Sequence, residues 1–348
     1  MIRADPTLVP DPTAYVAETV ATPVRPIPRA KRTQANLLPA RPFPPPPTAS
    51  AWARASGRAD GDPLFFAGAS LALLDAHLRC DPPAAGTLRA RLALQSAAAS
   101  AKILRLNADE DALRDLRFAV GDTLGPAAKL LDLWRDLAGR PPSLDPGRIR
   151  ATAAVLDLPA PNGDALAETL REQSRAGDPV SAAAKAAAFA FSAFPDAPAT
   201  EAEILALWAF DLALAIRLRW PRPLPLLSTT ILDPALRPPG RRRLRPDEPA
   251  WQIAAAGAIA LAAASALDLA ADLARRAKTL IAVAPKLRAK PAAKVIDLLL
   301  VEDCVSAAEA ARQAPMTDRA ARRLFDRLGV LGAVREFSGR PSFRLYGL

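Results

Sequence analysis

Four arginines recur along a short segment in the last thirty or so residues of the chain. Arg319, Arg322, Arg323 and Arg327 are spaced so that a helix would place them together on one side, because residues three or four apart are neighbours on a helix surface. A guanidinium can donate two hydrogen bonds to guanine O6 and N7, which is worth about 1–3 kcal/mol of discrimination between bases. A helix at this position would therefore present the side chains needed to read the major groove of duplex DNA.

The sequence ahead of these arginines predicts two short helices. Residues 294–303 carry apolar side chains at helical spacing, which is typical of an amphipathic helix. Ser306 is followed three residues later by Glu309, a capping-box pattern in which each side chain satisfies a backbone N–H at the helix start. This pattern predicts the second helix over residues 307–313.

The arginines themselves fall on a third predicted helix. Pro315 ends the preceding helix, because the residue before a proline is disfavoured in the α region. Thr317 is a suitable N-cap for a helix over residues 318–328. Arginines and Asp326 then face outward, and the predicted buried stripe of this helix consists of Ala320, Ala321, Leu324, Phe325 and Leu328.

A β-hairpin is predicted next. Gly329 is expected to end the third helix, and residues 331–337 and 342–346 read as two strands joined by a turn-rich link. Three short helices with a tight turn between the second and third match the layout of a helix-turn-helix. With the hairpin added, residues 290–348 resemble the winged helix-turn-helix domains of bacterial regulators.

This resemblance implies contacts with double-stranded DNA. The third helix would meet base edges with its N-terminal half, and the hairpin would touch the DNA backbone or minor groove. Two alternatives stay open, because winged helices also dock proteins and an arginine-rich face can simply be solvated. The candidate DNA-binding residues are Thr317, Arg319, Arg322, Arg323, Arg327, Arg340 and Arg344.

Composition agrees with a polyanionic partner. The chain has 348 residues, a formal net charge of +10 and a pI of about 10.3, which favours nucleic acid over other partners. Part of this excess reflects an alanine-, arginine- and proline-rich composition typical of bacterial genomes rich in G and C. The two cysteines, Cys80 and Cys304, form no spaced motif. We therefore expect a reduced, cytoplasmic setting.

The remaining regions predict a mostly α protein with three parts. Residues 1–61 are rich in proline and arginine and lack the apolar core of a signal peptide, so a disordered arm is expected. Residues 62–285 show helical periodicity without sustained alternation, which predicts an all-helical, bundle-like domain. The predicted helices cover residues 63–80, 84–106, 109–120, 126–138, 145–157, 164–175, 179–194, 200–219 and 251–283.

Two stretches of this helical domain call for separate interpretation. Residues 220–249 lose the helical pattern and form a basic loop, a possible second set of phosphate contacts. Residues 253–267 carry no charge, but the run is short and alanine-rich for a membrane span, so a core helix is expected and no membrane partner. The basic residues of the loop are Arg241, Arg242, Arg243 and Arg245.

The helical domain carries a resemblance of its own. Residues 65–116, with Phe66-Ala-Gly-Ala-Ser-Leu-Ala-Leu-Leu-Asp-Ala76 and then Asp81-Pro-Pro83, look like an uncharacterised bacterial helical family. In that family a domain of unknown function precedes a similar C-terminal segment. The resemblance implies no catalytic residues.

The sequence contains few of the motifs that are typical of enzyme active sites. The chain has one histidine, His77, and its neighbours Asp75 and Cys80 are too few for a closed zinc site. Neither a Walker loop nor a G-x-G-x-x-G stretch occurs, so no nucleotide cofactor is predicted. We expect no enzyme, no metal and no cofactor.

Two hypotheses of function follow. The first is a sequence-specific DNA-binding protein, a transcriptional regulator whose helical body forms a homodimer or binds a protein partner. The alternative is a helical scaffold or adaptor in a replication, partition or mobile-element complex, with the winged helix docking protein.

Overall fold

The computed structural model describes residues 47, 61–118, 125–175, 177–237, 243–287, 291–339 and 343–348. Contacts divide the chain into two compact units, Met1–Pro42 and Phe43–Leu348, and every described residue belongs to the second. The arm predicted over residues 1–61 lies almost wholly outside the described residues.

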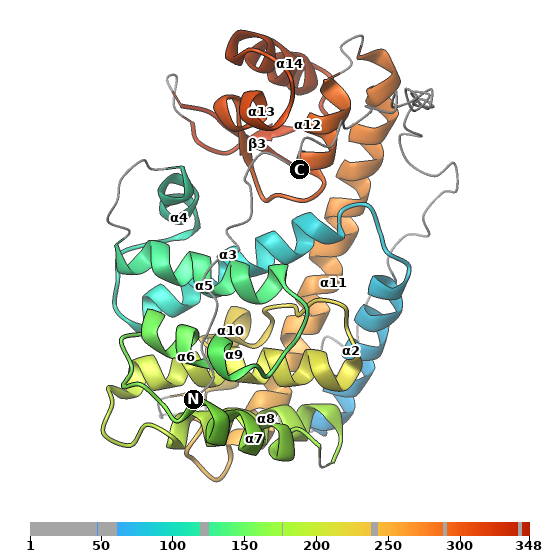
Figure 1. Ribbon diagram of the computed structural model, residues 1–348. Helices are drawn as coiled ribbons and strands as arrows, with labels where there is room; N and C mark the ends of the chain where they lie inside the picture. Colours follow the sequence, from blue (N-terminus) through green and yellow to red (C-terminus); the bar gives the residue numbers. More distant parts are fainter. Residues whose placement is uncertain are drawn as a thin grey trace, which may run out of the picture. The chain divides into compact units, whose positions relative to one another are not determined.

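Helices dominate the described chain (Figure 1). The sequence predicted most of the helices between residues 63 and 283 to within a few residues at each end. The helical body, which we define as the described residues 61–287, contains α2 (Pro63–Arg79), α3 (Ala85–Ile103), α4 (Glu110–Arg117), α5 (Pro126–Gly139), α6 (Pro146–Val155), α7 (Gly163–Gln173), α8 (Pro179–Ser192), α9 (Ala199–Leu218), α10 (Leu227–Thr230), the 3₁₀ turns η2 (Pro234–Leu236) and η3 (Ala284–Lys286), and α11 (Trp251–Val283).

Aspartates set the starts of several helices. Asp62, Asp145 and Asp178 each accept a hydrogen bond from a backbone N–H in the first turn, and a proline follows at the first helical position. The aspartate satisfies an N–H that has no partner within the helix, and proline has no N–H to satisfy. Local sequence alone therefore fixes where these helices begin.

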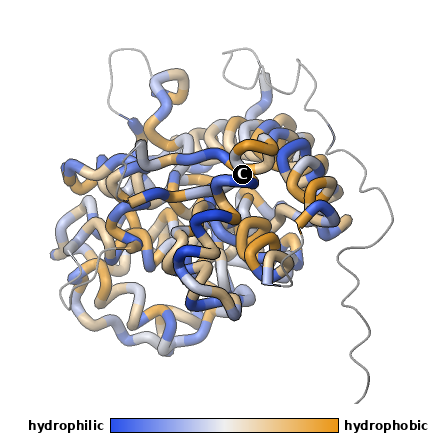
Figure 2. Tube along the Cα trace, turned by 90° about the horizontal axis from the view of Figure 1, so that it is seen from above, coloured by the Kyte–Doolittle hydropathy of each residue, from blue (hydrophilic) through white to orange (hydrophobic). Residues whose placement is uncertain are grey.

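The core of the body is built from small side chains with a few large ones. α11 packs along α2, and α8 packs against α9. Trp134, Trp208 and Phe210 are fully buried, whereas Phe189 and Phe191 are only half-buried. Hydrophobic and hydrophilic residues interleave along the same helices (Figure 2), as expected when each helix turns one side to the core.

Within the predicted loop over residues 220–249, the described part contains two short helical elements, α10 and η2, and several buried leucines that were not predicted. Leu224, Leu226 and Leu227 are fully buried, and α10 lies in this segment. The fully buried carboxylate of Asp211 on α9 accepts hydrogen bonds from the backbone N–H groups of Leu226 (3.0 Å) and Leu227 (3.1 Å). Proline-spaced leucines lack helical periodicity, but they still fill space between helices.

α11 is long and apolar enough to cross a membrane by length and composition. In this structure 67% of its most apolar window is buried inside the protein. The alanines along it, including Ala255, Ala260 and Ala263, are covered by neighbouring helices. This burial is typical of a core helix.

The C-terminal unit, defined as the described residues 291–348, combines short helices with a small sheet. Its elements are α12 (Ala292–Leu299), β1 (Val305–Ser306), α13 (Ala307–Gln313), α14 (Asp318–Val330), β2 (Arg335–Glu336) and β3 (Leu345–Gly347). The strands pair antiparallel in the order β1-β3-β2, with Val305 opposite Tyr346 and Glu336 also opposite Tyr346.

Three details of this unit differ from the sequence prediction. β1 was not predicted, because two residues are too short for an alternating pattern. The two hairpin strands are shorter than expected, and α14 continues through Gly329 to Val330. The glycine with a left-handed backbone is Gly332, at φ 65°, so the helix stop lies three residues later than Gly329.

Candidate nucleic-acid interface

α14 is fixed to the sheet by its apolar side. Ala321, Leu324, Phe325 and Leu328 are buried. The ring of Phe325 stacks on Tyr346 of β3, with ring centroids 4.5 Å apart and an interplanar angle of 2°. Figure 1 shows α14 on the side of the C-terminal unit away from α3 and α5. The opposite side of α14 is therefore turned to solvent.

That outer side carries the predicted arginines. Arg319, Arg322, Arg323 and Arg327 are all exposed. Arg322 pairs with Asp318 one turn earlier, at 2.7 Å between Nη2 and Oδ2, and the two side chains are 68% and 43% exposed. Water screens such a pair, so it is weak. The geometry offers a row of guanidiniums to a flat or grooved polyanion.

Helix caps set the register of this face. Thr317 accepts a hydrogen bond from Ala320 N (3.3 Å), and Ser306 accepts one from Glu309 N (3.1 Å), which confirms both predicted N-caps. Ala320 is exposed rather than buried, so the buried stripe is narrower than predicted. The Glu309 side chain does not close the capping box, because it is engaged by an arginine of the body.

The other predicted contact residues are spread more widely. Arg344 is about half exposed and lies 3.8 Å from Asp326 of α14, so the base of the hairpin is near the arginine face. Arg243 forms an ion pair with the buried Glu203, and Arg245 lies over the ring of Phe191. Both are engaged by the body itself. Arg241, Arg242 and Arg340 lie outside the described residues.

Contacts between the body and the C-terminal unit centre on a buried aspartate. Asp303 receives hydrogen bonds from Arg91 and from Arg114 Nε, the latter at 2.7 Å. All three residues are less than a tenth exposed. Burial alone would raise the pKa of Asp303, but the two guanidiniums hold this pKa below its ordinary value. The carboxylate is therefore charged and paired.

A second arginine bridge lies beside it. Arg117 on α4 donates to the carbonyl oxygen of Cys304 at 2.6 Å and to Glu309 Oε1 at 2.9 Å, and its Nη2 lies 3.0 Å from Glu302 Oε2. Glu302 is also bound by Arg135, at 3.0 Å. We call this set the joint, and its members are Arg91, Arg114, Arg117 and Arg135 of the body with Glu302, Asp303 and Glu309 of the C-terminal unit.

Close backbone and aromatic contacts surround the joint. The ring of Phe337, just after β2, lies within 5.2 Å of the Arg91 guanidinium and 4.8 Å of that of Arg114. Gly86 on α3 lies so close to Val301 that an added Cβ would sit 2.6 Å from its Cα. The hydroxyl of Thr87 donates to Leu299 O at 3.1 Å. The C-terminal unit thus docks on the body over a packed surface.

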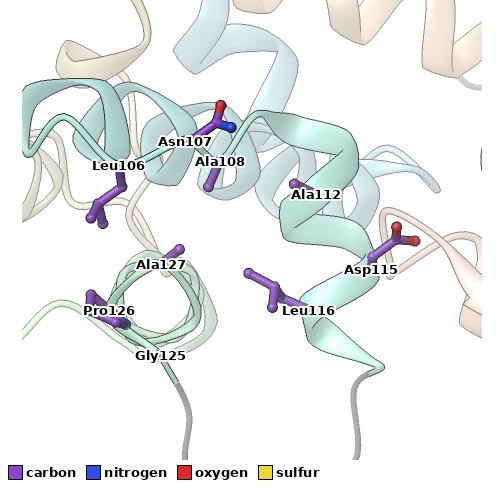
Figure 3. A pocket seen from close by; sticks show the side chains of 9 residues that line it. All are labelled: Leu106, Asn107, Ala108, Ala112, Asp115, Leu116, Gly125, Pro126 and Ala127. Carbon is purple, nitrogen blue, oxygen red and sulfur yellow. The ribbon is translucent and has the colours of Figure 1, made fainter.

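α4 supplies two arginines to the joint from one side and packs apolar groups on another. Figure 3 shows Leu116 directed toward α5 and Asp115 directed away from it. The space between α4 and α5 is an open apolar groove of about 520 Å³. Its described lining is Leu106, Asn107, Ala108, Ala112, Asp115, Leu116, Gly125, Pro126 and Ala127.

Acidic and basic side chains are unevenly distributed over the C-terminal unit, although Asp318 and Asp326 lie on α14 beside its arginines. The acids Glu302, Asp303 and Glu309 face the body, where arginines neutralise them. The arginines of α14 face away from the body and are exposed. The outer surface is consequently more basic than the composition of the segment indicates, which favours a polyanion.

Sequence reasoning missed the joint. The acids at 302 and 303 look like the solvated end of a helix, and Arg91 and Arg114 look like polar positions on body helices. A buried ion pair joins residues far apart in the chain, and spacing does not reveal it. The single local signal was α4, where Glu110 and Asp111 precede two arginines at helical spacing.

Within the described ranges, no group of three or more His, Cys, Asp and Glu side chains is arranged to hold a metal ion. His77 is buried, and burial lowers its pKa. Cys80 is exposed and Cys304 is buried, where burial and the charge of Asp303 raise the pKa of its thiol to about 12.

The fold is that of a mostly helical protein with a small C-terminal antiparallel sheet. Residues 42–348 match the family described as "Protein of unknown function (DUF1403)", and the chain belongs to that family. This agrees with the resemblance of residues 65–116 to an uncharacterised helical family. A comparison with curated proteins gave no match.

Proposed function

We propose that the protein is a sequence-specific DNA-binding protein, a non-enzymatic transcriptional regulator acting in the cytoplasm, and that its C-terminal unit is a winged helix. In this proposal α14 enters the major groove and the β2–β3 hairpin is the wing. The observation that carries it is the exposed row of Arg319, Arg322, Arg323 and Arg327 on a helix whose other side is buried.

The order of elements supports the proposal. α12, β1, α13, α14, β2 and β3 follow one another, with the strands in the order β1-β3-β2, as in the winged helix-turn-helix domains that the sequence resembles. Four residues separate α13 from α14, which suits a helix-turn-helix. The second helix of such a pair is the one that meets base edges.

Roles within the site follow from position. Thr317, Arg319 and Arg322 lie at the N-terminal end of α14, where a helix in the major groove approaches base edges, and Arg323 is next to them. Backbone N–H groups at a helix start also favour a phosphate. Arg327 is further along and is assigned to the phosphate backbone, with Arg344 and Arg340 on the wing.

The proposal is tested with the full-length chain and a pool of duplex DNA fragments. Bound fragments are selected and sequenced, and the affinity for a selected fragment is measured across a salt series. The logarithm of the affinity should fall by about 0.9 per phosphate neutralised for each tenfold rise in salt.

A triple variant, Arg319→Ala with Arg322→Ala and Arg323→Ala, should lose selective binding by about 30-fold or more, since two lost bidentate contacts cost about 2–6 kcal/mol. The matched control removes three exposed arginines of the body, Arg140, Arg150 and Arg275, and has the same net charge. If both triple variants bind alike, α14 does not select the sequence.

The scaffold or adaptor role remains the alternative, and one observation favours it. Val330, at the end of α14, is 89% exposed, as a protein-docking helix would require. Capture of partners by the full-length chain after nuclease treatment separates the two roles. Partners that persist without nucleic acid, together with no selected DNA sequence, would replace DNA binding with protein docking.

A further inference from the structure

We propose that Arg117 is a positioning residue for DNA binding, which holds α13, and through it α14, in one orientation on the helical body. This inference rests on the proposed function and deepens it, because it makes the body a determinant of how the arginine face meets DNA. The site assigned is a bridge inside the protein, and Arg117 itself touches no DNA.

The contacts of Arg117 single it out. Its guanidinium meets acceptors on two consecutive parts of the C-terminal unit: Glu302 and the Cys304 carbonyl lie before β1, and Glu309 lies on α13. A planar guanidinium with five donors can hold several acceptors in a fixed arrangement, which a lysine ammonium on a flexible stem does less well. The side chain is only 15% exposed, so the bridge is shielded from solvent.

The orientation of α14 depends on that of α13. α13 begins directly after the Ser306 cap, and Glu309 is its third residue, so Arg117 binds the first turn of that helix. α14 packs mainly against α13. The arginine face has no contact of its own with the body among the ion pairs and hydrogen bonds of the described residues. Its direction therefore depends on α13 and the sheet.

The residues of the joint have different roles. Asp303, buried with Arg91 and Arg114, anchors the unit. Its loss removes the carboxylate that pairs with Arg91 and leaves Arg114 with Asp111 and Glu110 of its own helix. Arg117 lies at the edge of the joint and reaches the helix-turn-helix itself. A variant at Arg117 can thus loosen the orientation while the anchor persists, which makes it the better residue to test.

The first test needs no DNA. Spin labels are attached at Lys185→Cys, an exposed position on α8, and at Asp326→Cys on α14, in a full-length Cys80→Ser background, and the distribution of distances is measured. The unmodified joint should give a narrow distribution, and Arg117→Ala should broaden it. The matched control is Arg148→Ala, because Arg148 is also a mostly buried arginine bound to an aspartate and carbonyl oxygens, but within the body. That variant should leave the distribution narrow.

Charge reversal sharpens the result. Arg117→Glu faces Glu302 and Glu309 with a like charge and should broaden the distribution most. Adding Glu309→Arg should narrow it again in part, which a general loss of folding would not do. A distribution that stays narrow in both Arg117→Ala and Arg117→Glu overturns the proposal.

The second test uses DNA. Arg117→Ala should bind the selected duplex about tenfold more weakly, yet keep the salt slope of the unaltered chain, because the arginine face is intact. Arg327→Ala should instead lower the slope by about 1, because Arg327 is assigned to the phosphate backbone. Unchanged affinity in Arg117→Ala, despite a broadened distribution, overturns a role in DNA binding. If the unaltered chain binds no duplex, the proposed function fails, and the spin labels still decide whether Arg117 positions α14.

Discussion

The buried residues of α11 and α2, which pack along each other, are mainly alanines and leucines, whereas the surface between the body and the C-terminal unit is built around charged groups. Apolar packing is non-directional and depends little on salt or pH. Buried ion pairs require particular partners in particular positions, and they bring little net stability relative to apolar packing. The contrast separates a region that supplies stability from one that supplies orientation.

The largest expected effect lies in the apolar core. Phe210 is fully buried on α9, and Phe210→Ala should destabilise the protein by about 3–5 kcal/mol, through lost transfer energy and the cavity left behind. Urea unfolding should show the same loss at low and high salt. Phe65→Ala is the control, since Phe65 is 60% exposed. If the loss of stability in Phe210→Ala varied strongly with salt, the distinction between the apolar core and the charged joint would not hold.

A loss of stability of comparable or somewhat smaller size is expected at the joint. This loss should be concentrated in the C-terminal unit. Asp303→Ala leaves Arg91 and Arg114 buried without their carboxylate, which typically costs about 3–5 kcal/mol. Amide hydrogen exchange should accelerate throughout residues 291–348 more than in the body. The control is Asp297→Ala, at an exposed position on α12. Equal acceleration in body and C-terminal unit would show that they unfold as one.

Two buried aspartates should respond to pH with opposite signs. The pKa of Asp303 is held low by its arginines, despite burial, so its stabilising effect is present above the unfolded pKa and is lost as pH falls through the folded one. Burial raises the pKa of Asp211 well above its ordinary value, with only partial offset by the backbone N–H groups of Leu227 and Leu226. The stability that Asp211 contributes is therefore fully present below the pKa of the unfolded state. It is lost as pH rises through the pKa of the folded state.

The stabilities of the C-terminal unit and of the body should therefore change with pH in opposite directions. Below about pH 4, near the ordinary pKa of aspartate, exchange in residues 291–348 should accelerate relative to the body. Above that pH, urea unfolding of the body should show stability that declines toward the raised pKa of Asp211, and Asp211→Asn should flatten the decline. Parallel pH profiles for the two regions would contradict the assignment of these charges.

A smaller effect is expected at the start of α13. Ser306→Ala removes the acceptor for Glu309 N and should cost about 1 kcal/mol, whereas Ser306→Gly should cost only a few tenths of that unit. Thermal unfolding of both variants measures the difference. Equal costs for alanine and glycine would mean that the hydroxyl is not acting as a cap.

Local chemistry explains why much of the fold could be read from the sequence. Asp62, Asp145 and Asp178 act through neighbouring backbone groups, and Thr317 and Ser306 do the same in the C-terminal unit. Such signals span three or four residues, so they locate helix starts well. Helix ends were less predictable, as Gly329 shows, because a glycine ends a helix only where the backbone turns left-handed.

Other features could not be read in this way, because their causes lie far apart in the chain. Asp303 and Arg91 are separated by 212 positions, and nothing near either residue indicates the other. The buried leucines at 224, 226 and 227 lie in a proline-rich stretch, and their burial depends on Asp211 and the surrounding helices. The arginine face of α14 was predictable, since helical spacing alone separates it from the buried stripe.

The central claim, that α14 meets duplex DNA while the body holds it in place, is tested most directly by hydrogen exchange on the full-length chain with and without a selected duplex. We expect slower exchange in residues 318–330 and in the described parts of the hairpin, with no change in α10, which is buried in the body. Protection confined to the helical body, with residues 291–348 unchanged, would contradict it.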